Sequence, residues 1–105
     1  MSAPLSEPLF HGTAHAFKPG DIVKPHDSAL GHGAFATSKT IVADIFAGSE
    51  DRLRRGQQGH LFGMVYEVEP LKGDETVRDA GTYAYRSDKG FKVKKLHHFV
   101  AGDYR

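Results

Sequence analysis

The sequence contains no cysteine among its 105 residues. This absence excludes a disulfide framework and any chemistry that needs a thiolate, and it is typical of cytoplasmic proteins. No uninterrupted apolar run approaches the roughly 18 residues of a membrane helix, and the start of the chain lacks the basic and apolar regions of a signal peptide. We therefore expect a cytoplasmic protein without a membrane segment.

An excess of charge of one sign is also missing. Lysine and arginine number 14 against 13 aspartates and glutamates, so the formal net charge is +1. That balance gives no bulk charge for a nucleic-acid groove, and we expect no nucleic-acid partner. The histidine pairs lack the spacing and supporting acids of a zinc site, so we expect no metal. The length suits one hydrophobic core, which predicts one domain over residues 9–105 after a loose lead-in over residues 1–8, and we expect a monomer.

Strand-like stretches outnumber helical ones. A helix is predicted from an N-cap at Ser38 to a C′ residue near Gly48, with an apolar stripe of Ile41, Ile45 and Gly48 joined by Val42 and Phe46. Residues 26–33 are interpreted as a surface loop, residues 50–59 as a loop with helical leanings, and residues 74–79 as an acidic loop or a short strand. This pattern favours an α+β fold with mainly antiparallel pairing. The predicted strands lie at 9–10, 22–23, 34–36, 60–69, 83–87, 91–93 and 96–100.

The stretch Leu9-Phe10-His11-Gly12-Thr13 changes from apolar to polar within one residue. If a buried strand begins at Leu9, His11 lies where that strand ends. Glycine has no Cβ, so a flat ligand could approach its backbone closely, and the threonine hydroxyl can bond backbone or ligand. Taken alone, these residues are better explained by a turn after a strand with a half-exposed histidine.

Three further features follow in order along the chain. The strand Ala34–Ala36 runs through Thr37 into the predicted helix, a long strand ends at Glu69-Pro70 before Asp74, and Tyr85-Arg86-Ser87 comes last. This order resembles the Arr family, the rifamycin-inactivating ADP-ribosyltransferases of bacteria, from Phe10 to Val100. The motifs that carry the resemblance are His11-Gly12-Thr13, Gly20-Asp21-Ile22-Val23, Phe35-Ala36-Thr37-Ser38, Val68-Glu69-Pro70, Asp74 to Asp79 and Tyr85-Arg86-Ser87.

The resemblance implies a fold and an activity. The fold would be a small split antiparallel β-sandwich of the ADP-ribosyltransferase type with one or two short helices. The activity would be cleavage of the nicotinamide–ribose bond of NAD and transfer of ADP-ribose to a hydroxyl of a small molecule, with a rifamycin as the implied acceptor. Such a glycosyltransferase would confer antibiotic resistance and would use NAD as a co-substrate.

The resemblance also implies roles for single residues. His11 would bond a ribose hydroxyl, and the backbone of Gly12, with Thr13 beside it, would hold the nicotinamide carboxamide. Asp74 would be the catalytic carboxylate, with Glu75 as the alternative. Phe35 stands where the family has a stacking tyrosine. A diphosphate or ribose would meet Thr37 and Ser38 at a helix N-terminus, and Arg86 could hold a phosphate with two bonds.

Each of these residues also has a purely structural interpretation. His11 can be a satisfied strand-end histidine, Phe35 plain core, Asp74 a turn residue and Arg86 a solvated side chain. Two further functions stay open on the sequence. One is a non-catalytic domain that binds NAD or ADP-ribose. The other is an NAD-dependent 2′-phosphotransferase acting on RNA, because such enzymes also begin with His-Gly-Thr, although the low net charge argues against it.

Overall fold

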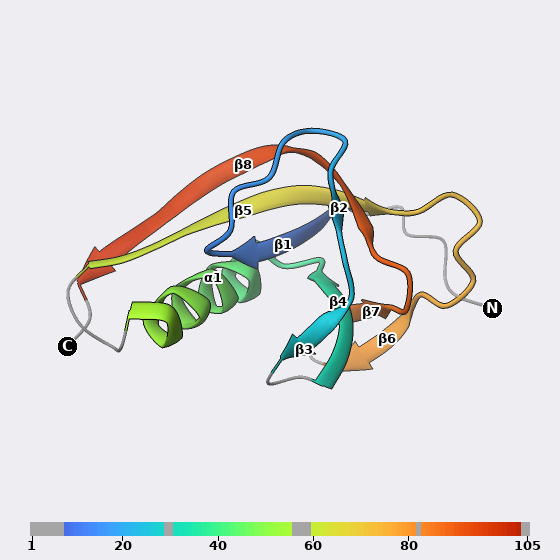
Figure 1. The fold of residues 1–105 in the computed structure, drawn as a ribbon, viewed down its shortest axis with the longest axis horizontal. Helices are drawn as coiled ribbons and strands as arrows, with labels where there is room; N and C mark the ends of the chain where they lie inside the picture. The colour runs from blue at the N-terminus through green and yellow to red at the C-terminus, as the bar shows by residue number, and fades with distance from the viewer. Residues whose placement is uncertain (1–7, 29–30, 56–59, 82, 104–105) are drawn as a thin grey trace.

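The computed structural model describes residues 8–28, 31–55, 60–81 and 83–103. In this part of the chain, eight strands and one helix form a mostly antiparallel α+β structure (Figure 1), as the sequence predicts. The strands are β1 (Leu9–Thr13), β2 (Ile22–Val23), β3 (His26–Ser28), β4 (Gly31–Thr37), β5 (His60–Pro70), β6 (Arg78–Gly81), β7 (Ala84–Ser87) and β8 (Phe91–Asp103), and the helix is α1 (Thr40–Arg55).

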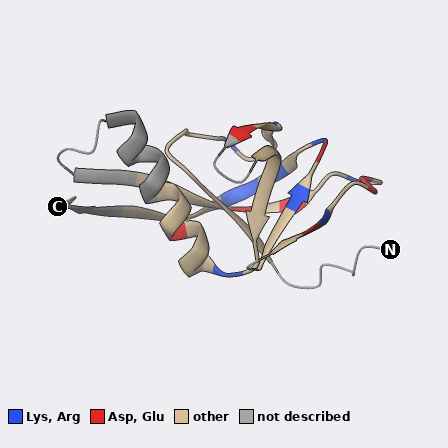
Figure 2. Cartoon of the chain, turned by 90° about the horizontal axis from the view of Figure 1, so that it is seen from below, with Lys and Arg blue, Asp and Glu red and all other residues tan. Residues whose placement is uncertain are grey.

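The sheet has the strand order β2-β8-β5-β1-β4-β7-β6, and β3 pairs with β4 beside it. Every pairing is antiparallel. β5 and β8 form a long two-stranded ribbon above α1 (Figure 1), and its valine and aromatic residues favour an extended backbone. Basic and acidic residues are interspersed along the described strands (Figure 2), in keeping with the low net charge.

One face of β1 and β5 packs against α1 through very small residues. The helix contributes Ala43 and Ala47, both fully buried. A Cβ added at Gly12 would lie 1.9 Å from the carbonyl oxygen of Ala43, and one at Gly63 would lie 2.7 Å from the Cβ of Ala47. Only glycine allows the helix to approach this closely, so the two glycines fix the position of α1 on the sheet.

The opposite face holds the larger hydrophobic core. Side chains of β1, β5 and β8 meet those of β4 there, with Phe17 and Tyr85 packed against the edge. The loop after β1 is tied onto this face, since the Phe17 amide donates to the Tyr66 hydroxyl at 2.8 Å. The buried members of this core are Leu9, Val23, Ala34, Ala36, Met64, Tyr66, Val68, Phe91 and Val93.

The helix differs from its prediction at both ends. The carbonyl of Lys39 accepts the first helical hydrogen bonds, from Val42 and Ala43, so Ser38 is not the N-cap. The helix continues through Gly48 to Arg55, which corrects the predicted loop from residue 50 onward. Residues 56–59 lie outside the described residues. A single glycine weakens a helix by only about 1 kcal/mol, which does not suffice to end it.

The buried stripe of the helix is also not the predicted one. Ile41 and Ile45 are 69% and 59% exposed, whereas Ala43 and Ala47 are fully buried. The physical reason is the close approach at Gly12, where an isoleucine side chain has no room. The prediction placed the larger residues on the buried face because they are more hydrophobic. The narrow space between the helix and the sheet admits only the smaller ones.

One predicted loop and one predicted strand position also need correction. Residues 26–33 are not one surface loop, because β3 pairs with the start of β4, with His26 opposite Gly33 and Asp27 opposite His32. Residues 29–30 lie outside the described residues, as do residues 1–7 of the predicted lead-in. Tyr83 is not on the strand face of Tyr85. It precedes β7 with a φ of 63° and is 62% exposed.

Candidate functional site

Three of the sequence motifs come together on adjacent strands. The sheet order places β1, β4 and β7 side by side, although they lie far apart in the chain. β1 carries His11, β4 carries Phe35, and β7 carries Arg86, which is registered opposite Phe35. The motifs that the sequence shows only as an ordered series therefore form one region, which we call the β1–β4 junction with its β7 flank.

The β1–β4 junction has very little backbone pairing. The two strands are registered at Phe10 and Thr37. Beyond that point the imidazole of His11 crosses between them, and its Nδ1 lies 2.8 Å from the carbonyl oxygen of Phe35. A carbonyl only accepts hydrogen bonds, so Nδ1 carries the proton and, in the neutral imidazole, Nε2 is an acceptor. The junction thus fixes both the orientation and the tautomer of His11.

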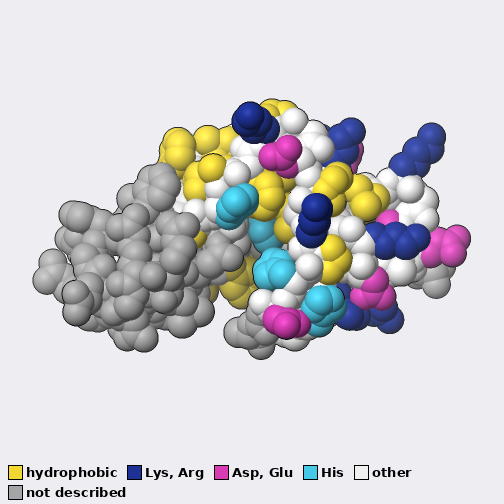
Figure 3. All heavy atoms as spheres, in the orientation of Figure 1, with side chains coloured by type: hydrophobic (Ala, Val, Ile, Leu, Met, Phe, Trp, Pro, Cys, Tyr) yellow, Lys and Arg dark blue, Asp and Glu magenta, His cyan; other side chains and the backbone are white. Residues whose placement is uncertain are grey.

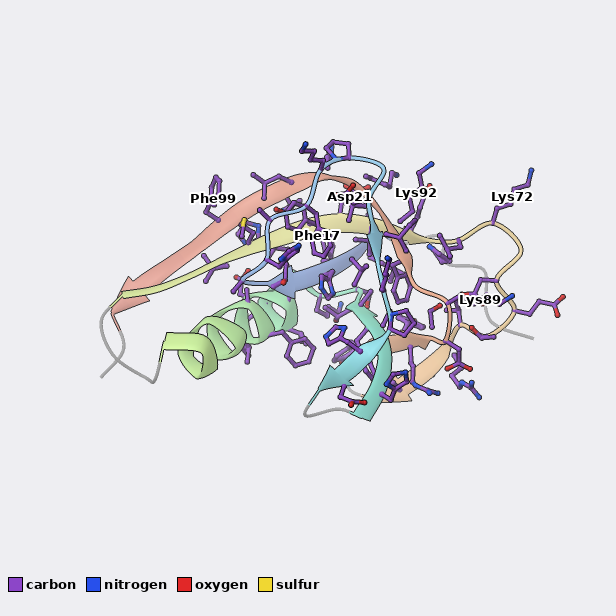
Figure 4. All side chains as sticks on the ribbon, viewed as in Figure 1. Phe17, Asp21, Lys72, Lys89, Lys92 and Phe99 are labelled. Atoms are coloured by element: carbon purple, nitrogen blue, oxygen red, sulfur yellow. The ribbon has the colours of Figure 1, made fainter. Side chains whose placement is uncertain are left out.

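The ring of Phe17 connects this histidine with two further rings. Phe17 meets the ring of His11 edge to face at a centroid distance of 6.1 Å, and it meets Tyr66 at 5.5 Å and His15 at 4.8 Å. Figure 4 shows Phe17 between the loop after β1 and the strands below it. His11 and Phe35 are themselves buried, with 8% and 7% exposed. The site is therefore a packed junction with a partly exposed aromatic edge, and Phe35 belongs to its buried part.

The other two residues of the first motif have clear structural tasks. Gly12 faces α1, where its missing Cβ permits the helix contact. Thr13 is almost fully buried, and its hydroxyl accepts the amide of His15 at 2.9 Å. Contact of these two residues with nicotinamide stays a prediction.

Asp74 fastens the loop after β5 to the turn after β7. One carboxylate oxygen accepts from the Thr76 amide at 2.8 Å and from its hydroxyl at 2.6 Å, and the other accepts from the Ser87 hydroxyl. Ser87 in turn accepts the amides of Lys89 and Gly90 at 3.0 and 2.9 Å. Because Ser87 is registered opposite Ala34 of β4, Asp74 is linked to the strand that His11 contacts.

The same contacts determine the protonation of Asp74. Burial raises its pKa, but the hydrogen bonds from Ser87 and Thr76 and the charge of Lys89 outweigh burial and hold the pKa below its ordinary value of 3.8. Asp74 is therefore a fixed negative charge at neutral pH. The alternative acid, Glu75, is exposed.

The residues predicted to hold phosphate are engaged in the fold. Arg86 donates from Nε to the carbonyl of His32 at 2.7 Å and forms an ion pair with Asp88 at 2.9 Å. Thr37 is fully buried, and its hydroxyl accepts the amide of Lys39 at 3.1 Å. The amide of Ser38 donates to the carbonyl of Tyr83 at 3.2 Å. A ligand contact by any of these three residues stays a prediction.

The sequence patterns did not single out Phe17, whose ring contacts His11, or His15, whose ring contacts Phe17. Their only sequence signal is that a histidine and an aromatic residue follow the first motif at short spacing. The patterns also missed the contact of His98 with Asp44 on α1, at 2.5 Å. Within the described ranges, no group of three or more histidine or acidic side chains gathers to hold a metal ion, and no helix there is long and apolar enough to cross a membrane.

Comparison with known proteins adds no relative. No family model, no curated protein and no solved structure matches this chain. The function is therefore argued from the β1–β4 junction and its β7 flank.

Proposed function

We propose that the chain is a small NAD-dependent ADP-ribosyltransferase of the split-sandwich type, which transfers ADP-ribose to a hydroxyl of a small molecule. The acceptor implied by the sequence resemblance is a rifamycin antibiotic. The observation that carries the proposal is the meeting of His11, Phe35 and the Tyr85-Arg86-Ser87 segment on three adjacent strands.

The chemistry needs orientation and negative charge more than a strong nucleophile. The bond between C1′ of the ribose and the nicotinamide nitrogen breaks, and nicotinamide leaves with the electron pair. A bond then forms between C1′ and the acceptor oxygen, whose proton is released. The intermediate ribose is an oxocarbenium-like cation, which a fixed carboxylate stabilises electrostatically.

Two side chains have properties suited to these roles. His11 is held by its Nδ1–H on the Phe35 carbonyl, so its Nε2 would accept a hydrogen bond from a ribose hydroxyl. Asp74 is ionised at neutral pH because its pKa is lowered despite burial, by Ser87, Thr76 and Lys89. Its charge would act on the ribose cation or on the acceptor hydroxyl without a change in its own protonation.

The test is mass spectrometry of rifampicin after incubation with the protein and NAD. The expected product carries one added ADP-ribose unit. A His11→Asn variant is the matched control, because its amide NH₂ can still donate to the Phe35 carbonyl while the Nε2 acceptor is removed; it should make no product. NAD consumption without a modified rifampicin would redirect the search to another acceptor. The proposal fails if neither the wild type nor a Phe35→Tyr variant consumes NAD.

A second candidate is a non-catalytic domain that binds NAD or ADP-ribose. The engagement of both Asp74 oxygens by Ser87 and Thr76 favours it, because that carboxylate already has partners. This candidate predicts measurable NAD binding without turnover, unchanged in an Asp74→Ala variant that remains folded. NAD consumption that requires added RNA would instead favour the 2′-phosphotransferase.

A further inference from the structure

We propose that His15 is a ligand-binding residue that donates a hydrogen bond to a phosphate group of the dinucleotide. This inference rests on the proposed function and deepens it. His15 lies just after β1, four residues after His11. The rings of both histidines contact the same phenylalanine, Phe17, at centroid distances of 4.8 Å for His15 and 6.1 Å for His11.

The loop that carries His15 is held firmly at several points. The amide of His15 donates to the Thr13 hydroxyl at 2.9 Å, and the amide of Phe17 donates to the Tyr66 hydroxyl at 2.8 Å. Further along, the Gly20 amide donates to the carbonyl of Val93 on β8 at 2.8 Å. The His15 backbone therefore lies between two fixed points. A donor held in this way loses little conformational entropy when a ligand binds.

The imidazole of His15 is available to a ligand. Its residue is exposed, and its ring nitrogens have no hydrogen-bond or ion-pair partner among residues 8–28, 31–55, 60–81 and 83–103. Figure 3 shows histidine side chains, drawn in cyan, at the surface over the region of β1 and the β3–β4 hairpin. Phe17 therefore connects the exposed imidazole of His15 with the buried ring of His11.

The chemistry of the ligand then selects the phosphate group. A diphosphate needs N–H donors, and an imidazole has an N–H in either protonation state. The predicted donors are engaged elsewhere, since Arg86 bonds the His32 carbonyl and Asp88 and the Ser38 amide bonds Tyr83. His15 is a donor on the His11 side that the fold leaves unused.

The experiment compares two ligands by titration calorimetry, ADP-ribose, which contains the diphosphate, and nicotinamide riboside, which contains no phosphate. Loss of one hydrogen bond to a charged group predicts about tenfold weaker binding of ADP-ribose to a His15→Ala variant. Nicotinamide riboside should bind that variant within about twofold of the wild type. A His15→Gln variant, which keeps an N–H donor, should recover part of the ADP-ribose affinity.

A His97→Ala variant is the matched control, because its imidazole contacts Phe10, a residue of the helix-side core, instead of Phe17. It should leave the affinities for both ligands unchanged. The His15 inference is overturned if His15→Ala leaves ADP-ribose binding unchanged, or if it weakens both ligands equally. If the wild type itself does not bind ADP-ribose, the His15 inference is overturned; if the wild type also neither binds nor consumes NAD, the proposed function is overturned with it.

Discussion

The two sides of β1 are stabilised in different ways. On the side of Phe10 and Gly12, the contact with α1 is made by small apolar residues at the closest approach that the backbone allows. On the side of His11, strand pairing with β4 gives way to a side-chain hydrogen bond, and the Asp74–Ser87 network supports the neighbouring β7. One side of β1 is thus a contact that tolerates no added atom, and the other is held together by hydrogen bonds of polar side chains.

The largest effect is expected at the helix contact. Replacing Gly12 by alanine places a Cβ 1.9 Å from the Ala43 carbonyl oxygen, so the helix must move away from the sheet. We expect a loss of about 3 kcal/mol or more in the free energy of unfolding, measured by urea denaturation. Gly73→Ala is the control: nothing lies within 4 Å of its added Cβ, so only the strain of its φ of +77° remains, which costs alanine about 1–2 kcal/mol.

A smaller effect is expected on the polar side. Ser87→Ala removes a hydroxyl that donates to Asp74 and accepts the amides of Lys89 and Gly90. Because these partners would each lose a hydrogen bond, we expect a loss of about 1–3 kcal/mol in the free energy of unfolding. Ser87→Thr, which keeps the hydroxyl, should lose less. Equal losses in the two variants would show that packing, and not the hydroxyl, stabilises this turn.

Acid should weaken the same network. The pKa of Asp74 is lowered in the folded state, since the bonds from Ser87 and Thr76 and the Lys89 charge outweigh burial. Its contribution to stability is thus fully present above the ordinary value of 3.8 and is lost as pH falls through the lowered folded-state pKa. Urea midpoints of the wild type and Asp74→Asn should therefore converge as pH falls below 3.8. A constant difference between them at all pH values would exclude this linkage.

The smallest effect is expected on the outer face of α1. Ile41→Ser should change the free energy of unfolding by no more than about 0.5 kcal/mol, since the side chain is 69% exposed and the helix propensities of the two residues are similar. Thermal and urea unfolding measure this directly. A loss above about 1 kcal/mol would mean that Ile41 is covered, as the hydrophobic pattern of the sequence suggested.

Local patterns predicted the strands well, because β-branched and aromatic residues in β5 and alternating residues at the start of β8 specify an extended backbone. They failed at α1, where the choice between Ile41 and Ala43 for the buried face depends on the space left by Gly12, a residue of another strand. They also failed at Tyr83, whose positive φ accompanies a hydrogen bond to its carbonyl from the Ser38 amide.

The sequence named the residues of the candidate site but did not show which contacts they make. The motif order named His11, Phe35, Asp74 and Arg86. It did not show that His11 bonds the Phe35 carbonyl or that Arg86 bonds the His32 carbonyl, because both contacts depend on the strand order β1-β4-β7. His15 carries no motif, and its proposed role depends on a contact with Phe17 that it shares with His11.

The most direct test of the central claim, that the β1–β4 junction and its β7 flank form one dinucleotide site, is a titration of isotope-labelled protein with NAD, followed by amide chemical shifts. If these strands form one dinucleotide site, the shifts concentrate at residues 11–17, 33–37, 74–76 and 84–88, and the outward edge of β8 at residues 95–100 stays unchanged. Shifts confined to α1 and β8, or the absence of any shift at millimolar NAD, would contradict it.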